Sequence, residues 1–449
     1  MGKTGNKNVI ATDRYVDTEN GTVNRRIFSD PDIYQQEMRQ IFARSWNFMC
    51  HTSQILDPGS YFLNSIGEDQ VIIVRDREGE VNVFLNSCPH RGNTVCRAEQ
   101  GKTSSFFCSY HGWNFDLDGR LLAVPGLDKY YENDLDIDNL GLARAAQVDI
   151  YRGFVFATLD PEAIPLVDFL GWVGRLSIDL VAERGEMEVV DGIQKNRIQC
   201  NWKLAVDNLF DWYHPKVSHL SAIRAGAITE ESLFPMDQMV ILGEYGHGIG
   251  GPGVSVDRQA QMDAKYQGPR RDEGNRGAFS NAWRASDKAK EQLGPIGIRS
   301  RGHPNLFPNV WVALGGNQLC LRIPKGPLET ELWWFTLVEK SMSAEERREV
   351  VQAAIHFFGP AGLLEQDDGE NWIHSTRTSR GTVTGERASN FSMRQGHDTV
   401  YQDGEQKSIE TVVNEHGQLW TYRCWEEWMR AKDWDDLVRN HSPEPTGKI

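Results

Sequence analysis

The segment CPHRGNTVCRAEQGKTSSFFCSYHGW, residues 88–113, contains two short clips that each combine a cysteine with a histidine. Cys88 and His90 form the first clip, and Cys108 and His111 form the second. Each clip places a thiol and an imidazole on one tight turn, so clips on two neighbouring loops give four converging ligands. Four nitrogen and sulfur ligands suit either a tetrahedral zinc ion or an iron–sulfur cluster in which two histidines replace two cysteines.

Glycines around the two clips favour the iron–sulfur cluster over zinc. Gly92, Gly101 and Gly112 allow close backbone approach, and loop N–H groups can then donate to bridging sulfides, which zinc does not require. The pairing of Cys-Pro-His-Arg with Cys-x-x-His-Gly-Trp closely resembles the Rieske [2Fe–2S] motif. Cys96, which lies between the clips, is expected to be a small buried residue.

The bulk properties indicate a globular enzyme of two domains. A chain of 449 residues exceeds one ordinary core, and 39% apolar with 25% charged residues is an ordinary globular composition. The net charge of −15 argues against binding to nucleic acid or to an anionic membrane. We find no apolar run that suits a signal peptide or a transmembrane helix, and therefore expect a cytoplasmic protein. Seven widely spread cysteines are better explained as including metal ligands than as a disulfide framework.

The sequence around the two clips predicts a small all-β domain at residues 40–160. Short β-type runs flank turn residues in two hairpin patterns, and the second contains the strong Asp118-Gly119 turn signal. The predicted strands are residues 71–74, 81–85, 113–117, 120–123 and 153–159. Residues 1–39 and 161–449 would then form a second, larger domain.

The larger domain shows long helices and long strands, so the fold class is α+β. Residues 344–358 predict an amphipathic helix that stops at Gly359-Pro360, and three antiparallel strands are predicted at 309–315, 319–324 and 331–339. The stretch 248–295 is glycine-rich and polar with little periodicity. We therefore expect it to be a long loop that acts as a mobile cover over the substrate channel.

A second constellation lies in NWKLAVDNLFDWYHPKVSH, residues 201–219. Asp211 and His214 are three residues apart, which places them on one face of a helix. Pro215 is expected to end or kink that helix, so that His219 can fold back beside His214. Two histidines and a carboxylate form the facial triad of non-haem Fe(II) oxygenases. The acidic run at 365–370 could supply the carboxylate, although such a run by itself is more often a solvated helix face.

From residue 28 to residue 434 the chain is similar to the α subunits of Rieske non-haem iron ring-hydroxylating dioxygenases, the group of naphthalene, biphenyl, phenylpropionate and benzoate dioxygenases. The shared motifs are the cysteine–histidine quartet, Asp-x-x-His-x4-His, and FGPAG followed by EQDDGENW. The resemblance implies a catalytic domain of the helix-grip type. It assigns the cluster to Cys88, His90, Cys108 and His111, and the mononuclear iron to His214, His219 and Asp368. It also makes Asp211 the link between the iron site and a neighbouring subunit's Rieske histidine.

Eight further residues are predicted to line the substrate pocket. His303, Asn305, Phe358 and Leu364 resemble pocket-lining positions of the family, whereas Asn208, Leu209, Trp212 and Pro215 surround the iron ligands in sequence. Phe358 and Leu364 could equally serve core packing, and His303 could be an ordinary loop histidine. The interval from Asn208 to Asp211 matches the benzoate type, but EQDDGENW looks like the biphenyl type, so the ring substrate stays open.

The resemblance implies a reaction and a set of partners. The expected reaction adds both atoms of O2 to an aromatic ring and gives a cis-dihydrodiol. Electrons would come from NADH through a flavin reductase and a ferredoxin, and a small β subunit would complete an α3β3 assembly. One alternative is a monooxygenase or demethylase of the same superfamily. Others are a Rieske electron carrier, which would have no use for His214, His219 and Asp368, and a colourless zinc-stapled binding protein.

Overall fold

The structure is a computed structural model that describes residues 14–226, 237–264, 281–445 and 448–449. The chain divides into two units. One is the continuous segment Phe42–Leu166, and the other combines Met1–Ile41 with Val167–Ile449. None of the helices in the described ranges combines the length and the apolar character needed to cross a membrane.

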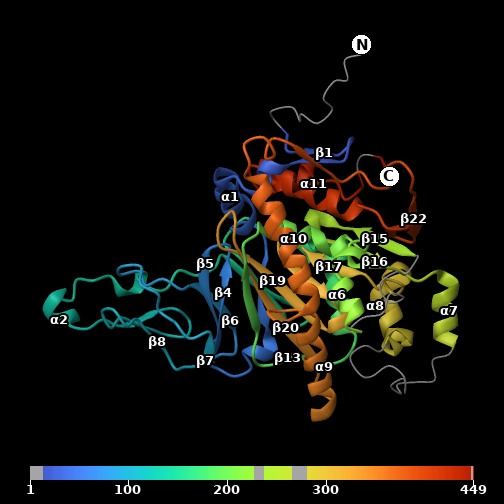
Figure 1. The fold of residues 1–449 in the computed structure, drawn as a ribbon. Coiled ribbons are helices and arrows are strands. Elements are labelled where there is room, and N and C mark those ends of the chain that lie inside the picture. The colour runs from blue at the N-terminus through green and yellow to red at the C-terminus, as the bar shows by residue number, and fades with distance from the viewer. Residues whose placement is uncertain (1–13, 227–236, 265–280, 446–447) are drawn as a thin grey trace. The chain divides into compact units, whose positions relative to one another are not determined.

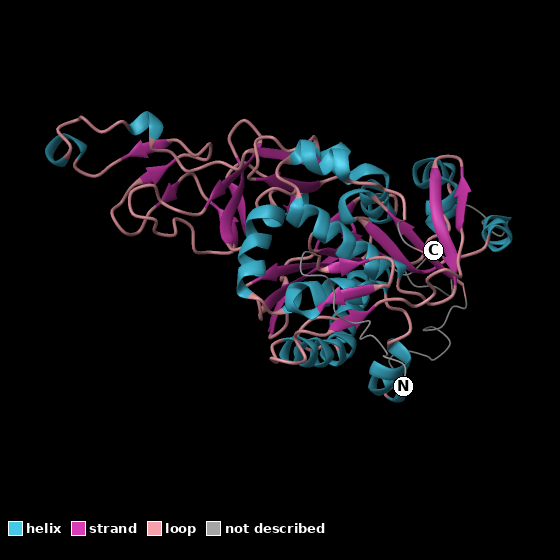
Figure 2. Cartoon of the chain, turned by 90° about the horizontal axis from the view of Figure 1, so that it is seen from above, coloured by secondary structure: helices cyan, strands magenta, loops and turns pink. Residues whose placement is uncertain are grey.

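Short antiparallel strands build the unit Phe42–Leu166, as the all-β prediction requires, and Figure 2 shows how loops connect them. One sheet has the order β11-β12-β3, a second β6-β5-β4-β7, and a third β10-β9-β8. Their bounds are β3 Asn47–His51, β4 Ser60–Ile66, β5 Asp69–Arg75, β6 Val81–Leu85, β7 Gln100–Lys102, β8 Phe106–Phe107, β9 Asn114–Phe115, β10 Leu121–Ala123, β11 Gln147–Tyr151 and β12 Phe154–Thr158. Both predicted hairpins are present, as β5–β6 and β9–β10. A short helix, α2 (Leu127–Tyr130), follows them.

The larger unit is organised around one antiparallel sheet with the order β13-β20-β19-β18-β17-β16-β15-β23-β22, in which β14 also pairs with β20. The bounds are β13 Met187–Val189, β14 Gln194–Ile198, β15 Gln238–Leu242, β16 Gly248–Pro252, β17 His303–Leu306, β18 Val310–Ala313, β19 Gln318–Pro324, β20 Thr330–Glu339, β22 Val400–Asp403 and β23 Gln406–Thr411. The three predicted strands are therefore β18, β19 and β20. A small sheet joins β1 (Val16–Asp17), β2 (Thr22–Asn24) and β21 (Ala388–Asn390).

Helices cover the sheet of the larger unit (Figure 1). α4 (Trp202–Asp207) and α10 (Leu363–Ser379) share one hydrophobic core with strands β18 to β20. Trp311, Cys320 and Trp334 supply the strand side of that core, and Trp372 comes from α10. The predicted helix at 344–358 is α9 (Ala344–Phe357), and it begins with a capping box between Ser343 and Glu346. The other helices are α1 Pro31–Glu37, α3 Leu166–Ala182, α5 Pro215–Ser218, α6 Leu220–Arg224, α7 Val256–Ala264, α8 Asp287–Gly297, α11 His416–Arg430 and α12 Trp434–Asn440.

A buried ion pair connects α4 with α1, and its carboxylate also contacts α11. Lys203 of α4 bonds to Glu37 of α1, and the two side chains are 2% and 0% exposed. The same carboxylate accepts hydrogen bonds from the indole N–H of Trp202 at 2.9 Å and from that of Trp425 on α11 at 2.8 Å. Because three donors converge on Glu37, its buried charge is well compensated.

The prediction of a long loop over 248–295 is wrong for most of its length. This stretch contains the sheet strand β16, the helix α7 and the helix α8. Only its middle part, residues 265–280, lies outside the described residues. The predicted cover over the channel is therefore not a continuous loop.

The glycines of β16 explain the error. A Cβ atom at Gly250 would lie 2.6 Å from Cδ1 of Phe210, and one at Gly251 would lie 2.3 Å from Nε1 of Trp212. Glycine is present because these two rings pack directly on the strand backbone. The glycine-rich sequence that suggested a loop therefore forms a strand, and the segment that carries Asp211 packs against the backbone of this strand.

Candidate active site

The two cysteine loops have the same backbone design. The N–H of Cys88 donates to the carbonyl of Asn93 at 2.9 Å, and the N–H of Cys108 donates to the carbonyl of Trp113 at 2.8 Å. In each loop the residue four positions after the cysteine is a glycine that returns a hydrogen bond to the cysteine carbonyl. These glycines, Gly92 and Gly112, have φ values of 71° and 78°, which favour glycine.

The four side chains of the loops converge. The thiols of Cys88 and Cys108 lie within hydrogen-bonding reach of each other, and the rings of His90 and His111 have centroids 4.4 Å apart. Nδ1 of His90 is buried and has no hydrogen-bond partner in the described part of the chain. Two sulfur and two nitrogen donors, one of them an unpartnered buried atom, fit a Rieske [2Fe–2S] cluster. Cys96 is buried nearby and bonds weakly to the carbonyl of Ala98 at 3.6 Å.

The surroundings of Cys108 favour a thiolate. Burial alone raises the pKa of this thiol, but N–H groups of Tyr110, Asn93 and His111 point at the sulfur and lower its pKa below the ordinary value. The amide of Asn93 lies 3.6 Å from the sulfur. Because iron binds the thiolate form, the loop is preorganised for a metal ligand.

Helix α10 turns Asp368 into the core. Its buried residues recur at helical spacing, and they are Glu365, Asp368, Gly369, Trp372, Thr376 and Ser379. The acidic run is thus split, because Gln366 and Glu370 do not belong to this buried face. The alternative that the run is only a solvated helix face is excluded for Asp368.

The segment that carries Asp211 and His214 is not one helix, so that prediction is wrong. α4 ends at Asp207, a 3-10 turn covers Asn208–Phe210, and α5 begins at Pro215. Oδ1 of Asp211 accepts hydrogen bonds from the backbone N–H of Tyr213 at 3.2 Å and of His214 at 3.1 Å. Proline is favourable in the first turn of a helix, where its missing N–H costs nothing, so Pro215 starts a helix instead of ending one.

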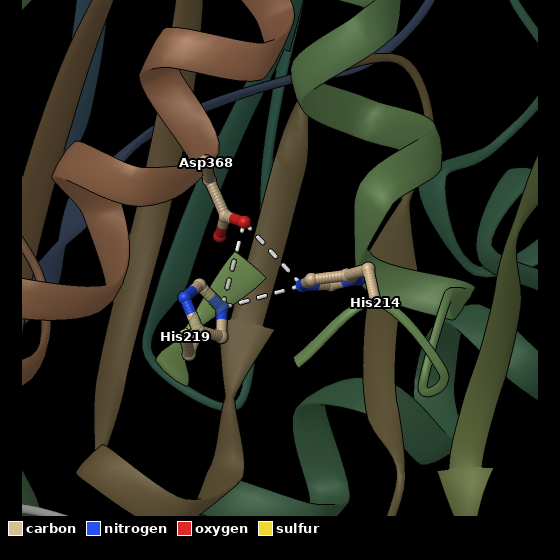
Figure 3. Close-up of side chains that lie close together, drawn as sticks. All are labelled: His214, His219 and Asp368. Atoms are coloured by element: carbon tan, nitrogen blue, oxygen red, sulfur yellow. Dashed lines mark hydrogen bonds and ion pairs between the residues drawn. The ribbon is translucent and has the colours of Figure 1, made fainter. Parts of the chain in front are cut away.

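This arrangement brings together His214, His219 and Asp368 (Figure 3). Nε2 of His214 lies 3.3 Å from Nε2 of His219 and 3.3 Å from Oδ1 of Asp368, and the third separation, His219 to Asp368, is 3.5 Å. Metal–ligand bonds of about 2.1 Å place neighbouring donor atoms about 3 Å apart on one face of an ion. Two imidazoles and one carboxylate at these separations fit a single Fe(II).

Each of the two histidines has a further polar contact. Nδ1 of His214 lies 3.5 Å from Oδ1 of Asp211, and Nδ1 of His219 lies 3.4 Å from Oδ2 of Asp367. Such contacts orient a ligating imidazole. Burial lowers the pKa of His214, but the carboxylates of Asp211 and Asp368 outweigh burial and raise that pKa to about 10. A metal ion held here would need the unprotonated nitrogen, so its binding would release a proton from His214.

A cavity of about 310 Å³ opens onto these three side chains. It is lined by Asn208, Leu209, Asp211, Trp212, His214, Pro215, His219, His303, Trp311, Gly315, Phe357, Phe358, Leu364 and Asp368. Asn305 is not among them, because it is fully buried within β17 beside the carbonyl of Gly246. Trp311, Gly315 and Phe357 line the cavity without having been predicted. The only signal for Trp311 was its place in a predicted strand.

Comparison with known proteins identifies the chain. Residues 45–144 match the family model of the Rieske [2Fe-2S] domain, and residues 173–419 match that of the ring hydroxylating alpha subunit, catalytic domain. The chain is 34% identical to biphenyl 2,3-dioxygenase subunit alpha of Rhodococcus jostii strain RHA1, over 94% of this chain and 92% of that one. It belongs to the ring-hydroxylating α-subunit family.

Further comparisons support the same family for this ring-hydroxylating α subunit. It is 33% identical to benzene 1,2-dioxygenase subunit alpha of Pseudomonas putida, over 94% of both chains. A structure of naphthalene 1,2-dioxygenase with indole bound in the active site superposes with a TM-score of 0.83 at 28% identity, covering 95% of this chain and 96% of that one. The α subunit is thus an oxidoreductase, the catalytic subunit of an aromatic-ring dioxygenase that carries a Rieske cluster and a mononuclear iron and uses O2. The zinc and electron-carrier alternatives are set aside.

Proposed function

We propose that this α subunit adds both atoms of one O2 to adjacent carbons of an aromatic ring, giving a cis-dihydrodiol. The observation that carries this proposal is the cavity, which joins an apolar, aromatic wall to the His214, His219 and Asp368 cluster. An aromatic ring in this cavity lies beside the three side chains that we assign as iron ligands. The relatives named for biphenyl and benzene support a ring substrate.

In the same proposal Cys88, His90, Cys108 and His111 hold the Rieske cluster, and residues 40–160 form its domain. The cluster supplies single electrons, and the iron offers open positions for O2 beside the substrate. The electrons come from NADH through a flavin reductase and a ferredoxin, and a small β subunit completes an α3β3 assembly. The protein works in the cytoplasm, which fits seven buried cysteines that form no disulfide, two of which we assign to the cluster.

Isotope labelling tests the reaction. The reconstituted complex is offered a panel of arenes and aromatic acids under labelled O2, and the products are identified. We expect a diol in which both hydroxyl oxygens carry the label from one molecule of O2. A product with one labelled oxygen, or a demethylated product, would instead assign the monooxygenase alternative.

Asp211 is proposed to link the iron site to a cluster histidine of the adjacent α subunit. Asp211→Asn keeps the oxygen that caps His214 but removes the charge. We expect turnover to fall about 10- to 100-fold, the usual loss for such supporting groups, while the iron content and the Rieske absorption stay unchanged. The measurement is the rate at which a pre-reduced cluster is oxidised in the iron-replete variant. If iron occupancy falls together with activity, Asp211 only orients His214.

A further inference from the structure

The two cysteine–histidine loops contact each other through the residue five positions after each cysteine. In the first loop this residue is Asn93, and in the second loop it is Trp113. The ring of Trp113 stacks on the ring of His90 in the first loop, with centroids 4.9 Å apart and an interplanar angle of 2°. The amide nitrogen Nδ2 of Asn93 lies 3.6 Å from Sγ of Cys108 in the second loop. The loops thus exchange one contact in each direction.

Both contacts follow from the backbone design that the loops share. The carbonyl of Asn93 accepts a hydrogen bond from the N–H of Cys88, and the carbonyl of Trp113 accepts one from the N–H of Cys108. The backbone of each residue is therefore fixed beside its own cysteine, while its side chain reaches the opposite loop. Asn93 is half-buried and Cys108 is 1% exposed, so water competes little for the sulfur.

The neighbours of Nδ2 fix the orientation of the Asn93 amide. This nitrogen donates to the carbonyl of Thr94 at 3.0 Å and also faces the sulfur of Cys108. An amide nitrogen carries two N–H groups, one for each of these acceptors. In the flipped orientation the amide oxygen would face a carbonyl oxygen and a thiolate, neither of which can donate. The sulfur of Cys108 therefore receives an N–H group from Asn93.

This side-chain donor adds to donors from the backbone. Backbone N–H groups of the residues two and three positions after each cysteine point at its sulfur. These residues are His90 and Arg91 in the first loop and Tyr110 and His111 in the second. The amide of Asn93 is directed at Cys108 in addition to them. Hydrogen bonds to the sulfurs are among the factors that set the reduction potential of an iron–sulfur cluster.

We propose that Asn93 tunes the Rieske cluster by donating a hydrogen bond to the sulfur of Cys108, which raises the reduction potential. The inference rests on the proposed function, because that proposal places the cluster on the two cysteine–histidine loops. A reduced cluster carries one more negative charge than an oxidised cluster, so the donor N–H stabilises the reduced form more strongly. Asn93 acts through Cys108, and its donor makes the cluster easier to reduce.

A redox titration of the purified protein, followed by the visible absorption and the EPR signal of the cluster, tests the proposal. Asn93→Leu keeps a side chain of similar size without a donor. The equilibrium constant for one-electron reduction should fall about tenfold, which corresponds to about 59 mV. Asn93→Asp keeps the shape, loses the donor and adds a negative charge, so its potential should fall further. The potential is measured without turnover.

Asn139→Leu is the matched control. Asn139 is an exposed residue of the same unit, and its side chain donates to Oδ2 of Asp136 at 2.7 Å. Its replacement should leave the potential unchanged. An unchanged potential in both Asn93 variants at full cluster content overturns the proposal, and so does an equal shift in the control. Failure of both Asn93 variants to hold a cluster would make Asn93 a folding residue and would overturn the proposal as well.

The proposed function and this inference fail separately. A wild-type protein without a Rieske spectrum removes the cluster assignment itself. A wild-type protein that shows the spectrum and forms a labelled diol, but whose potential does not depend on residue 93, keeps the proposed function and loses the tuning role. If the potential falls in the Asn93 variants and no arene of the panel yields a labelled diol, the tuning role stands and the proposed reaction falls.

Discussion

Replacing Asp368 by alanine is expected to abolish product formation and to lower the iron content from about three atoms per chain to about two, the two of the Rieske cluster. The reason is geometric. Oδ1 of Asp368 lies 3.3 Å from Nε2 of His214 and 3.5 Å from Nε2 of His219, so it completes one triangular face. Two imidazoles without the carboxylate lose both a ligand and its negative charge.

The neighbouring residue is a matched control. Asp367 occupies the next position of α10, but its Oδ2 faces Nδ1 of His219 at 3.4 Å and the hydroxyl of Ser221 at 2.8 Å. Asp367→Ala should therefore keep the iron, with an affinity reduced about 10- to 100-fold. Iron analysis and the visible spectrum distinguish the variants. Full iron content in Asp368→Ala, or loss of the Rieske absorption with turnover intact, would refute the assignment of the site.

Lys203→Met is expected to destabilise the larger unit by about 3–5 kcal/mol, because it leaves the buried carboxylate of Glu37 without its cationic partner. Glu37 is 0% exposed, so water cannot replace the ammonium group. The indole N–H groups of Trp202 and Trp425 would remain as donors, but neither carries a charge. Because α4 leads directly into the segment with Asp211, iron retention should also weaken on heating.

Denaturant unfolding measures this change. The control is Lys340→Met, which breaks an ion pair with Glu186 in the same unit. Those side chains are 39% and 74% exposed, so the control should cost about 1 kcal/mol or less. An equal decrease in the free energy of unfolding in both variants would mean that the buried pair of Lys203 and Glu37 stabilises the unit no more than an exposed pair does.

The convergence of the two cysteine–histidine loops could be predicted from the sequence because the determinants of each loop are local. Cysteine, histidine and a turn glycine recur within six residues, so the convergence of each clip needs no knowledge of distant contacts. The hairpins β5–β6 and β9–β10 are local in the same sense. The site that we assign to the iron is different. Asp368 comes from a helix 149 positions after His219, and only the family resemblance chose it from an acidic run.

Three errors have one physical origin, namely that tertiary packing overrode a local rule. The spacing of Asp211 and His214 suits a helix, but a capped turn satisfies the backbone there instead. The glycines of β16 suit a loop, but they accommodate the ring of Phe210. Asn305 adjoins a true cavity residue in sequence, yet its side chain lies inside the sheet. None of these contacts can be derived from neighbouring residues alone.

The division of the chain has a consequence for synthesis on the ribosome. The unit Phe42–Leu166 is one continuous segment set into a unit whose first helix, α1, bonds to residues of α4 and α11. All strands of the smaller unit emerge within those 125 residues, so its sheets can close early, as domains fold in order of their appearance. The hydrogen bond between Glu37 and Trp425, by contrast, forms only after almost the whole chain has been synthesised. The cluster loops are thus available for cofactor insertion while the core that supports the iron site is still incomplete.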